Sequence, residues 1–183
     1  MTLADTVLDE LRPGLEPEVL AQIPSLSQQL VKARRVVCFG VGREGLMMKA
    51  LAMRLYHLGL DVHLPGEMTT PPVGPGDALF VSAGPGNFST VAALVNVARD
   101  SGATTICITA ELGGLVPKST DEVIHLPAQT MAADQGAMKT SILPMGSLFE
   151  ALMFLFFELL VLDMRDRLGI SSEAMRSKHT NLE

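Results

Sequence analysis

Residues 80–91, Phe-Val-Ser-Ala-Gly-Pro-Gly-Asn-Phe-Ser-Thr-Val, mark a point where a buried strand turns through glycines into a helix. The apolar run Ala78–Val81 has the length of a buried strand, and the turn Gly84–Gly86 lets backbone approach a ligand. Ser89 and Thr90 then precede an alanine-rich helical pattern. Free N–H groups and the helix dipole attract anions at such a helix start, with about 0.3–1 kcal/mol from the dipole alone. The stretch is therefore either an anion site or an ordinary turn between strand and helix.

Strand-like and helix-like stretches alternate along the rest of the chain. The predicted strands are residues 35–40, 61–65, 78–83, 104–109 and 122–126, and the predicted helices are residues 46–58, 89–101, 113–119, 144–168 and a short one starting at 171. This alternation predicts right-handed βαβ units and a parallel, doubly wound sheet. If the strand order is 2-1-3-4-5, the first and third strands are neighbours, and the glycine turns that follow them meet where such sheets bind ligands.

The first of these turns, Gly40–Gly45 (Gly-Val-Gly-Arg-Glu-Gly), is a literal G-x-G-x-x-G between a strand and a helix. This pattern is typical of dinucleotide-binding folds, which also place an acidic residue about 20 positions on, at the end of the second strand. Asp61 has the spacing but starts its strand, and Glu67 lies late. An NAD-binding domain is therefore kept as an alternative.

The composition fits one compact domain of 183 residues, with 48% hydrophobic residues, in which residues 1–34 form a helical arm and residues 35–183 the main unit. A net charge of −6 without a basic stripe argues against a nucleic-acid partner. The mean hydropathy of +0.31 favours burial of apolar surface between subunits, as in a homo-oligomer.

The cellular location is inferred from the cysteines and the apolar runs. Cys38 and Cys107 lie in strand-like runs, which predicts buried free thiols in a reducing cytoplasm. We expect no secretory signal at the N-terminus. The longest apolar run, Leu148–Leu162, contains two glutamates and is shorter than the roughly 20 residues of a membrane span.

Glu150 is the first candidate for a general base. Its neighbours Phe149, Leu152 and Phe154 predict partial desolvation, which would raise the pKa of its carboxyl toward the range useful for proton transfer. The alternative is that Glu150 faces solvent or pairs with a cation at a subunit contact. The four histidines show no metal-ligand spacing with a carboxylate or cysteine, so no metal is expected.

Five stretches carry a resemblance to a known family. They are Gly40–Gly45, Met53–Gly59 (Met-Arg-Leu-Tyr-His-Leu-Gly), Gly66–Pro72 (Gly-Glu-Met-Thr-Thr-Pro-Pro), Pro144–Glu150 (Pro-Met-Gly-Ser-Leu-Phe-Glu) and the ending Met175–Glu183. From about residue 35 to the end, the chain resembles the sugar isomerase (SIS) domain, and within it the 6-phospho-3-hexuloisomerase family. The resemblance implies a flavodoxin-like three-layer αβα sandwich with five parallel strands, a tetramer, no cofactor, and interconversion of a 3-ketose 6-phosphate with fructose 6-phosphate.

That reaction moves a hydrogen between adjacent carbons through an enediol, so it needs a base and a partner that shuttles protons between the oxygens. By resemblance, Glu150 and His179 share these tasks, the latter from a tail that folds into a neighbouring subunit. His57 and Glu67 would serve ring opening or contacts with sugar hydroxyls. The residues expected to bind substrate are Gly42, Arg43, Glu67, Ser82, Gly84, Gly86, Asn87, Ser89 and Thr90.

The chain departs from the family pattern in both glycine turns. Where members usually carry Ser-Gly-Ser-Gly-Glu-Thr, residues 83–88 are Ala-Gly-Pro-Gly-Asn-Phe, which removes three hydroxyls expected on the phosphate. Glu44 replaces a serine in the first turn, and its charge would repel a phosphate if it pointed inward. Either Ser82, Asn87, Ser89, Thr90 and backbone N–H groups hold the phosphate, or the ligand differs. A non-catalytic SIS module that senses a sugar phosphate or nucleotide-sugar is the second hypothesis.

Overall fold

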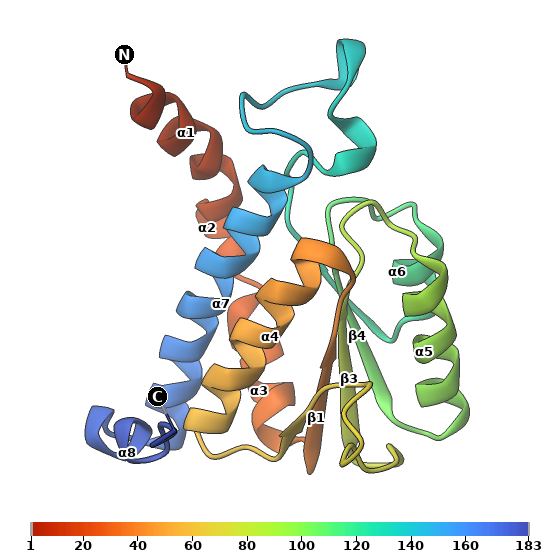
Figure 1. The fold of residues 1–183 in the computed structure, drawn as a ribbon, viewed down its shortest axis with the longest axis vertical. Helices are drawn as coiled ribbons and strands as arrows, with labels where there is room; N and C mark the ends of the chain where they lie inside the picture. The colour runs from red at the N-terminus through yellow and green to blue at the C-terminus, as the bar shows by residue number, and fades with distance from the viewer. Residues whose placement is uncertain (1, 183) are drawn as a thin grey trace.

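A computed structural model describes residues 2–182 and shows a five-stranded sheet between two layers of helices (Figure 1). The strands are β1 (Arg35–Phe39), β2 (Val62–His63), β3 (Asp77–Ser82), β4 (Thr104–Thr109) and β5 (Glu122–His125). Their order is β2-β1-β3-β4-β5, and every neighbouring pair is parallel. The predicted α/β sandwich and its strand order are confirmed.

Helices cover both faces of the sheet. The helices α3 (Ile23–Lys32), α4 (Gly42–His57) and α7 (Ser147–Leu168) pack together on one face, and α5 (Ser89–Asp100) and α6 (Leu115–Ser119) lie on the other (Figure 1). The remaining elements are α1 (Leu3–Leu11), η1 (Arg12–Leu15), α2 (Pro17–Leu20), η2 (Met131–Ala133), η3 (Gly136–Met138) and α8 (Ser172–Ser177). The helix α7 passes over the centre of its layer, since it packs against both α3 and α4.

The core has two parts, one on each side of the sheet. Alternate strand residues serve each part: Cys38 and Phe80 belong to the cluster under α4 and α7, and Val37 and Val81 to the cluster under α5. Because both faces are covered, these strands are continuous apolar runs rather than alternating ones. The rings of Phe80 and Phe157 meet edge to face with their centroids 5.9 Å apart.

Several predicted boundaries move by a few residues. The helix α7 begins at Ser147 rather than at Pro144, because Met145 has a positive φ of 56° and Gly146 caps the helix. It ends as predicted at Gly169, whose φ of 63° is the left-handed conformation that suits glycine. The strand β2 shrinks to two residues at the sheet edge.

The N-terminal segment contributes to the core. Leu26 and Leu30 on α3 are fully buried in the cluster that α4 and α7 share.

Both cysteines are buried as predicted, and burial raises the pKa of each thiol to about 12.

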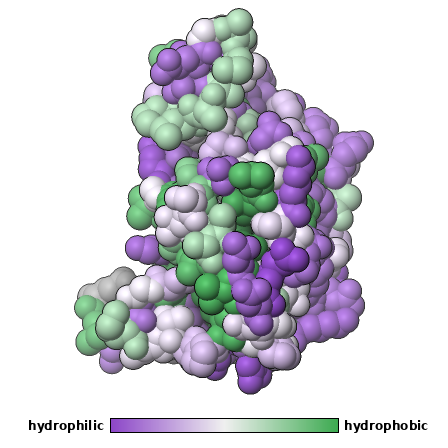
Figure 2. All heavy atoms as spheres, turned by 90° about the vertical axis from the view of Figure 1, so that its right-hand side faces the viewer, coloured by the Kyte–Doolittle hydropathy of each residue, from purple (hydrophilic) through white to green (hydrophobic). Residues whose placement is uncertain are grey.

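The surface carries apolar side chains in groups. Figure 2 views the side on which α5 and α6 lie, and apolar atoms form a band there among polar ones. Exposed apolar residues in this part of the chain include Val97 on α5, Leu112, and Leu115 on α6. Within residues 2–182 we find no helix long and apolar enough to cross a membrane.

Candidate active site

A pocket of about 400 Å³ lies beyond the carboxyl ends of β1 and β3, among the first turns of α4, α5 and α7. This is the edge at which open parallel sheets bind ligands. Its lining residues are Val41, Gly42, Arg43, Glu44, Pro85, Phe88, Ser89, Thr90, Thr130, Met131, Met145, Gly146, Phe149 and Glu150. The two glycine turns that sequence analysis singled out therefore border one pocket.

An ion pair crosses this pocket from α4 to α7. The Nε of Arg43 lies 2.5 Å from Oε2 of Glu150, whose side chain is only 12% exposed whereas that of Arg43 is 65% exposed. Glu150 sits in the first turn of α7 and Arg43 in the first turn of α4. The predicted pairing of Glu150 with a cation is therefore made inside one chain.

Glu44 points inward and is buried. Its Oε2 accepts hydrogen bonds from the hydroxyl of Ser82 and from the backbone N–H of Gly84, the latter at 2.9 Å. Burial raises the pKa of Glu44 above its ordinary value of 4.5, the two hydrogen bonds oppose this, and the charge of Glu150 adds to the rise. From the sequence, Glu44 was expected only to repel phosphate, and its place as a buried carboxyl in the pocket lining was missed.

The position of Glu44 changes the expected roles of two other residues. Ser82 is fully buried, and its hydroxyl and the N–H of Gly84 serve Glu44, so neither lines the pocket as a free donor for phosphate. A Cβ on Gly84 would lie 2.7 Å from both Oε1 of Glu44 and the ring of Phe149. The glycine is therefore needed for close packing against the carboxyl.

The start of α5 supplies the polar groups that remain for a ligand. Ser89 and Thr90 are exposed, line the pocket, and occupy the first turn of this helix. The backbone N–H groups of a first turn have no partner within the helix and attract anions. Gly42 and Arg43 present the start of α4 to the same pocket.

Three more of the predicted substrate-binding residues lie outside the pocket lining, in addition to Ser82 and Gly84. Gly86 is buried with a φ of 81°, and its carbonyl accepts from the N–H of Val116 at 3.0 Å, which ties the turn to α6. Asn87 in the same turn is exposed. Glu67 is exposed in the loop after β2.

The candidate histidines lie at the far end of α4. His57 is its last residue, 13 positions from Glu44 or about 20 Å along the helix axis, and the rings of His57 and His179 are 5.6 Å apart. Burial lowers the pKa of His57, and the charges of Arg54 and His179 lower it further. One chain therefore brings the two histidines to each other but not to Glu150.

The acidic residue that a dinucleotide site needs is engaged elsewhere. Asp61 pairs with Nε of Arg35 at 2.9 Å and with Nε2 of His63 at 2.8 Å on the edge of the sheet. Neither Asp61 nor Glu67 lines the pocket in front of the first glycine turn. The geometry gives the dinucleotide alternative no support.

Gln129 holds together the loop of residues 129–145, which borders the pocket through Thr130, Met131 and Met145. The buried side chain of this residue accepts from the N–H groups of Thr140 and Ser141 at 2.8 and 2.9 Å and donates to the carbonyl of Met145 at 3.1 Å. It thereby joins the two ends of the segment between residues 129 and 145. No sequence pattern distinguished Gln129 from other loop residues.

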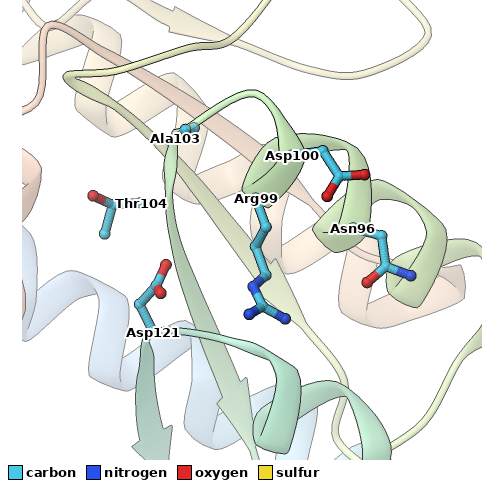
Figure 3. A pocket seen from close by; sticks show the side chains of 7 residues that line it. Asn96, Arg99, Asp100, Ala103, Thr104 and Asp121 are labelled. Atoms are coloured by element: carbon cyan, nitrogen blue, oxygen red, sulfur yellow. The ribbon is translucent and has the colours of Figure 1, made fainter.

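A second hollow of about 690 Å³ lies at the opposite end of the sheet, where α5 leads into β4 (Figure 3). Arg99, Asp100 and Asp121 give it a polar lining. The carboxylate of Asp121 accepts from the N–H and the hydroxyl of Thr105 at 2.8 and 2.7 Å, so its hydrogen bonds belong to the start of β4. Across residues 2–182 no group of three or more His, Cys, Asp or Glu residues is placed to hold a metal ion.

Comparison with known proteins assigns the fold to a family. Residues 29–155 match the model of the SIS domain. The chain belongs to the SIS domain family. The structure of a hypothetical protein from Methanococcus jannaschii, described as inferring a function of 3-hexulose-6-phosphate isomerase, is similar to this SIS domain with a TM-score of 0.83 and 28% identity, over 96% of this chain and 98% of the other.

Two curated relatives of this SIS domain carry the same name. The 3-hexulose-6-phosphate isomerase of Bacillus subtilis is 31% identical over 97% of this chain and 95% of its own length. That of Mycobacterium gastri is 34% identical over 92% of this chain and 82% of its own. The resemblance stated from the sequence is thereby confirmed.

Proposed function

We propose that this SIS domain is a ketose-phosphate isomerase of the 6-phospho-3-hexuloisomerase type. The observation that carries the proposal is the ion pair of Arg43 with Glu150, which borders a pocket built from the starts of three helices. Relatives of nearly full length bear the name of this activity, which supports the choice of substrate class. The expected reaction interconverts a 3-ketose 6-phosphate and fructose 6-phosphate, without a cofactor.

The phosphate has one favoured place in the pocket. The first turn of α5 offers N–H groups together with the hydroxyls of Ser89 and Thr90, and the exposed guanidinium of Arg43 stands at the start of α4. The donors of Ser82 and Gly84 are occupied by Glu44. Phosphate bound at α5 leaves the sugar carbons to extend toward Glu150 on α7.

Glu150 is the proposed base. In the proposed reaction its carboxylate takes the proton from C2 of the 3-ketose, which gives an enediol, and later returns it to C3. Its low exposure keeps bulk water from competing for the proton.

The experiment is a coupled assay for fructose 6-phosphate formed from the 3-hexulose 6-phosphate. Turnover by the wild-type protein well above that of Glu150→Gln is expected. Wild-type turnover no higher than that of the variant would contradict the proposed isomerase activity. An aldose phosphate and a hexosamine phosphate as alternative substrates show whether the class of sugar is right.

We further propose that the chain works as a cytoplasmic homo-oligomer, with a tetramer as the expected state. The separation of His57 and His179 from Glu150 within one chain supports this assembly, because a second copy can bring the tail histidine to the pocket. Light scattering coupled to size-exclusion chromatography measures the mass. A monomer at micromolar concentration contradicts the proposal.

A non-catalytic sugar-phosphate sensor is the second candidate. The observation that favours it is Glu44, which occupies two donors in the altered glycine turn. A sensor predicts thermal stabilisation by a phosphosugar without turnover, and ligand at about 100 times its Kd would add about 2.7 kcal/mol to the free energy of unfolding. Absence of stabilisation by any phosphosugar tested contradicts the sensor.

A further inference from the structure

We propose that Glu44 is the second proton-transferring group of this isomerase, which protonates the substrate carbonyl oxygen and takes the proton of the neighbouring hydroxyl. The inference rests on the proposed function. It assigns to a residue of the pocket the task that the resemblance gives to the tail residue His179.

Both hydrogen bonds described for Glu44 fall on the same carboxyl oxygen. Oε2 accepts from both the hydroxyl of Ser82 and the N–H of Gly84, so a proton on the carboxyl resides on Oε1. Glu44 also lines the pocket, where α4 places it beside Glu150 of α7. A protonated Oε1 thus adds a donor to the pocket for a substrate oxygen, beside those of Arg43 and the start of α5.

The charged and titratable groups around Glu44 favour this protonation. Arg43 on α4 directs its guanidinium to Glu150. Glu150 on α7 adds a negative charge, and Cys107 on β4 has a thiol whose pKa of about 12 keeps it neutral. The pocket therefore holds one carboxyl paired with a cation and one whose pKa is raised by burial, which is the arrangement that separates a base from an acid.

The proton transfers balance over one turnover. The carboxylate of Glu150 takes the proton from C2 while Glu44 gives its proton to the oxygen on C3, which forms the neutral enediol. Glu44, now ionised, takes the proton from the oxygen on C2 while Glu150 returns its proton to C3. The carbonyl has then moved from C3 to C2, and both carboxyls have regained their starting states.

The histidines are less suited to this task within one chain. His57 and His179 contact each other at the other end of α4, about 20 Å from Glu44 along the helix axis. Glu44, in contrast, already faces the same pocket as Glu150.

The test compares Glu44→Gln with Glu158→Gln, which changes a glutamate of α7 that lies outside the pocket lining. The glutamine keeps the size of the side chain but cannot shuttle a proton, so kcat should fall about 10²–10⁴-fold while KM for the 3-hexulose 6-phosphate changes less than about threefold. Glu158→Gln makes the same chemical change away from the pocket, so its kcat should stay within about twofold. Thermal unfolding of both variants checks that they fold.

Each outcome decides for or against Glu44. A kcat of Glu44→Gln within about threefold of wild type overturns the inference, and so does a raised KM with unchanged kcat. If the variant does not fold, the wild-type profile decides: kcat should fall as pH rises through the raised pKa of Glu44, and a profile without this fall overturns the inference. Wild-type protein without turnover rejects the proposed function instead.

Discussion

The two ends of α4 carry similar groups in different surroundings. Each end places an arginine of α4 against a glutamate of α7, with Arg43 pairing Glu150 at 2.5 Å and Arg54 pairing Glu158 at 3.3 Å. Glu150 is 12% exposed and borders the pocket with the buried Glu44, whereas Glu158 is 40% exposed. An arginine–glutamate pair of the same type is thus shielded from water beside the pocket and exposed at the other end, which is why only Glu150 is proposed to move a proton.

The largest expected difference between the ends is in turnover. Glu150→Gln should lower kcat about 10²–10⁴-fold, because it removes the proposed base. The matched variant Glu158→Gln changes the same residue type on the same helix, and should leave kcat within about twofold and stability within about 1 kcal/mol. Equal losses in the two variants would mean that the ion pairs matter for folding or assembly rather than for proton transfer.

The second difference is in tolerance of a methyl group. Gly84→Ala at the pocket end should lower the free energy of unfolding by about 3 kcal/mol, because the new Cβ meets a buried carboxyl and the Phe149 ring. Gly59→Ala at the other end should cost about 1–2 kcal/mol, since its φ is 93° but its nearest neighbour is the movable end of Lys178. Urea denaturation measures both, and the reverse order would contradict the packing described around Glu44.

The third difference is in the kinetic effect of replacing His179 at the tail and Glu44 in the pocket. With Glu44 as the proton shuttle, His179→Ala should reduce kcat/KM by about tenfold, because the proposed oligomer brings His179 to the sugar bound by a second copy. The measurement is steady-state kinetics beside Glu44→Gln. A loss in kcat as large as that of Glu150→Gln would return the shuttling role to His179.

The smallest difference is in the pH dependence of stability. Because the pKa of Glu44 is raised, its contribution is fully present below pH 4.5 and is lost as pH rises through the higher folded value. Because the pKa of His57 is lowered, its contribution is present above pH 6.5 and is lost as pH falls through the lower folded value. The melting temperature of Glu44→Gln should therefore differ from that of wild type by about 2 °C at one end of the pH range, and that of His57→Gln by about 2 °C at the other end. If the melting temperatures of both variants followed that of wild type at every pH, the buried surroundings described for Glu44 and His57 would be contradicted.

The sheet was predictable because its signal is local. Runs such as residues 104–109 are β-branched except at Cys107 and buried except at Thr104, since helices cover both sides, and the turns between such runs contain glycine or proline. The start of α7 was misplaced by three residues because Met145 adopts a positive φ, which no propensity for methionine indicates.

The candidate site was predictable in place but not in detail. Two glycine turns after neighbouring strands locate the pocket, since parallel strands end at one edge. Whether Glu44 turns outward or inward depends on Ser82 and Gly84, about 40 positions along the chain, which pattern reasoning does not connect. The roles of Glu150, His57 and His179 remain predictions.

The amide of Gln129 has a consequence for how the pocket can vary. Its hydrogen bonds hold residues 140–141 and Met145 close to the segment that follows β5. The segment between Met131 and Lys139 is therefore a loop whose two ends are fixed, and we call it the appendage. Residues could be added to or removed from this appendage without moving Gly146 or the first turn of α7. One pocket wall can therefore be remodelled for a longer or shorter ligand while Glu44 and Glu150 keep their positions at the end of the sheet.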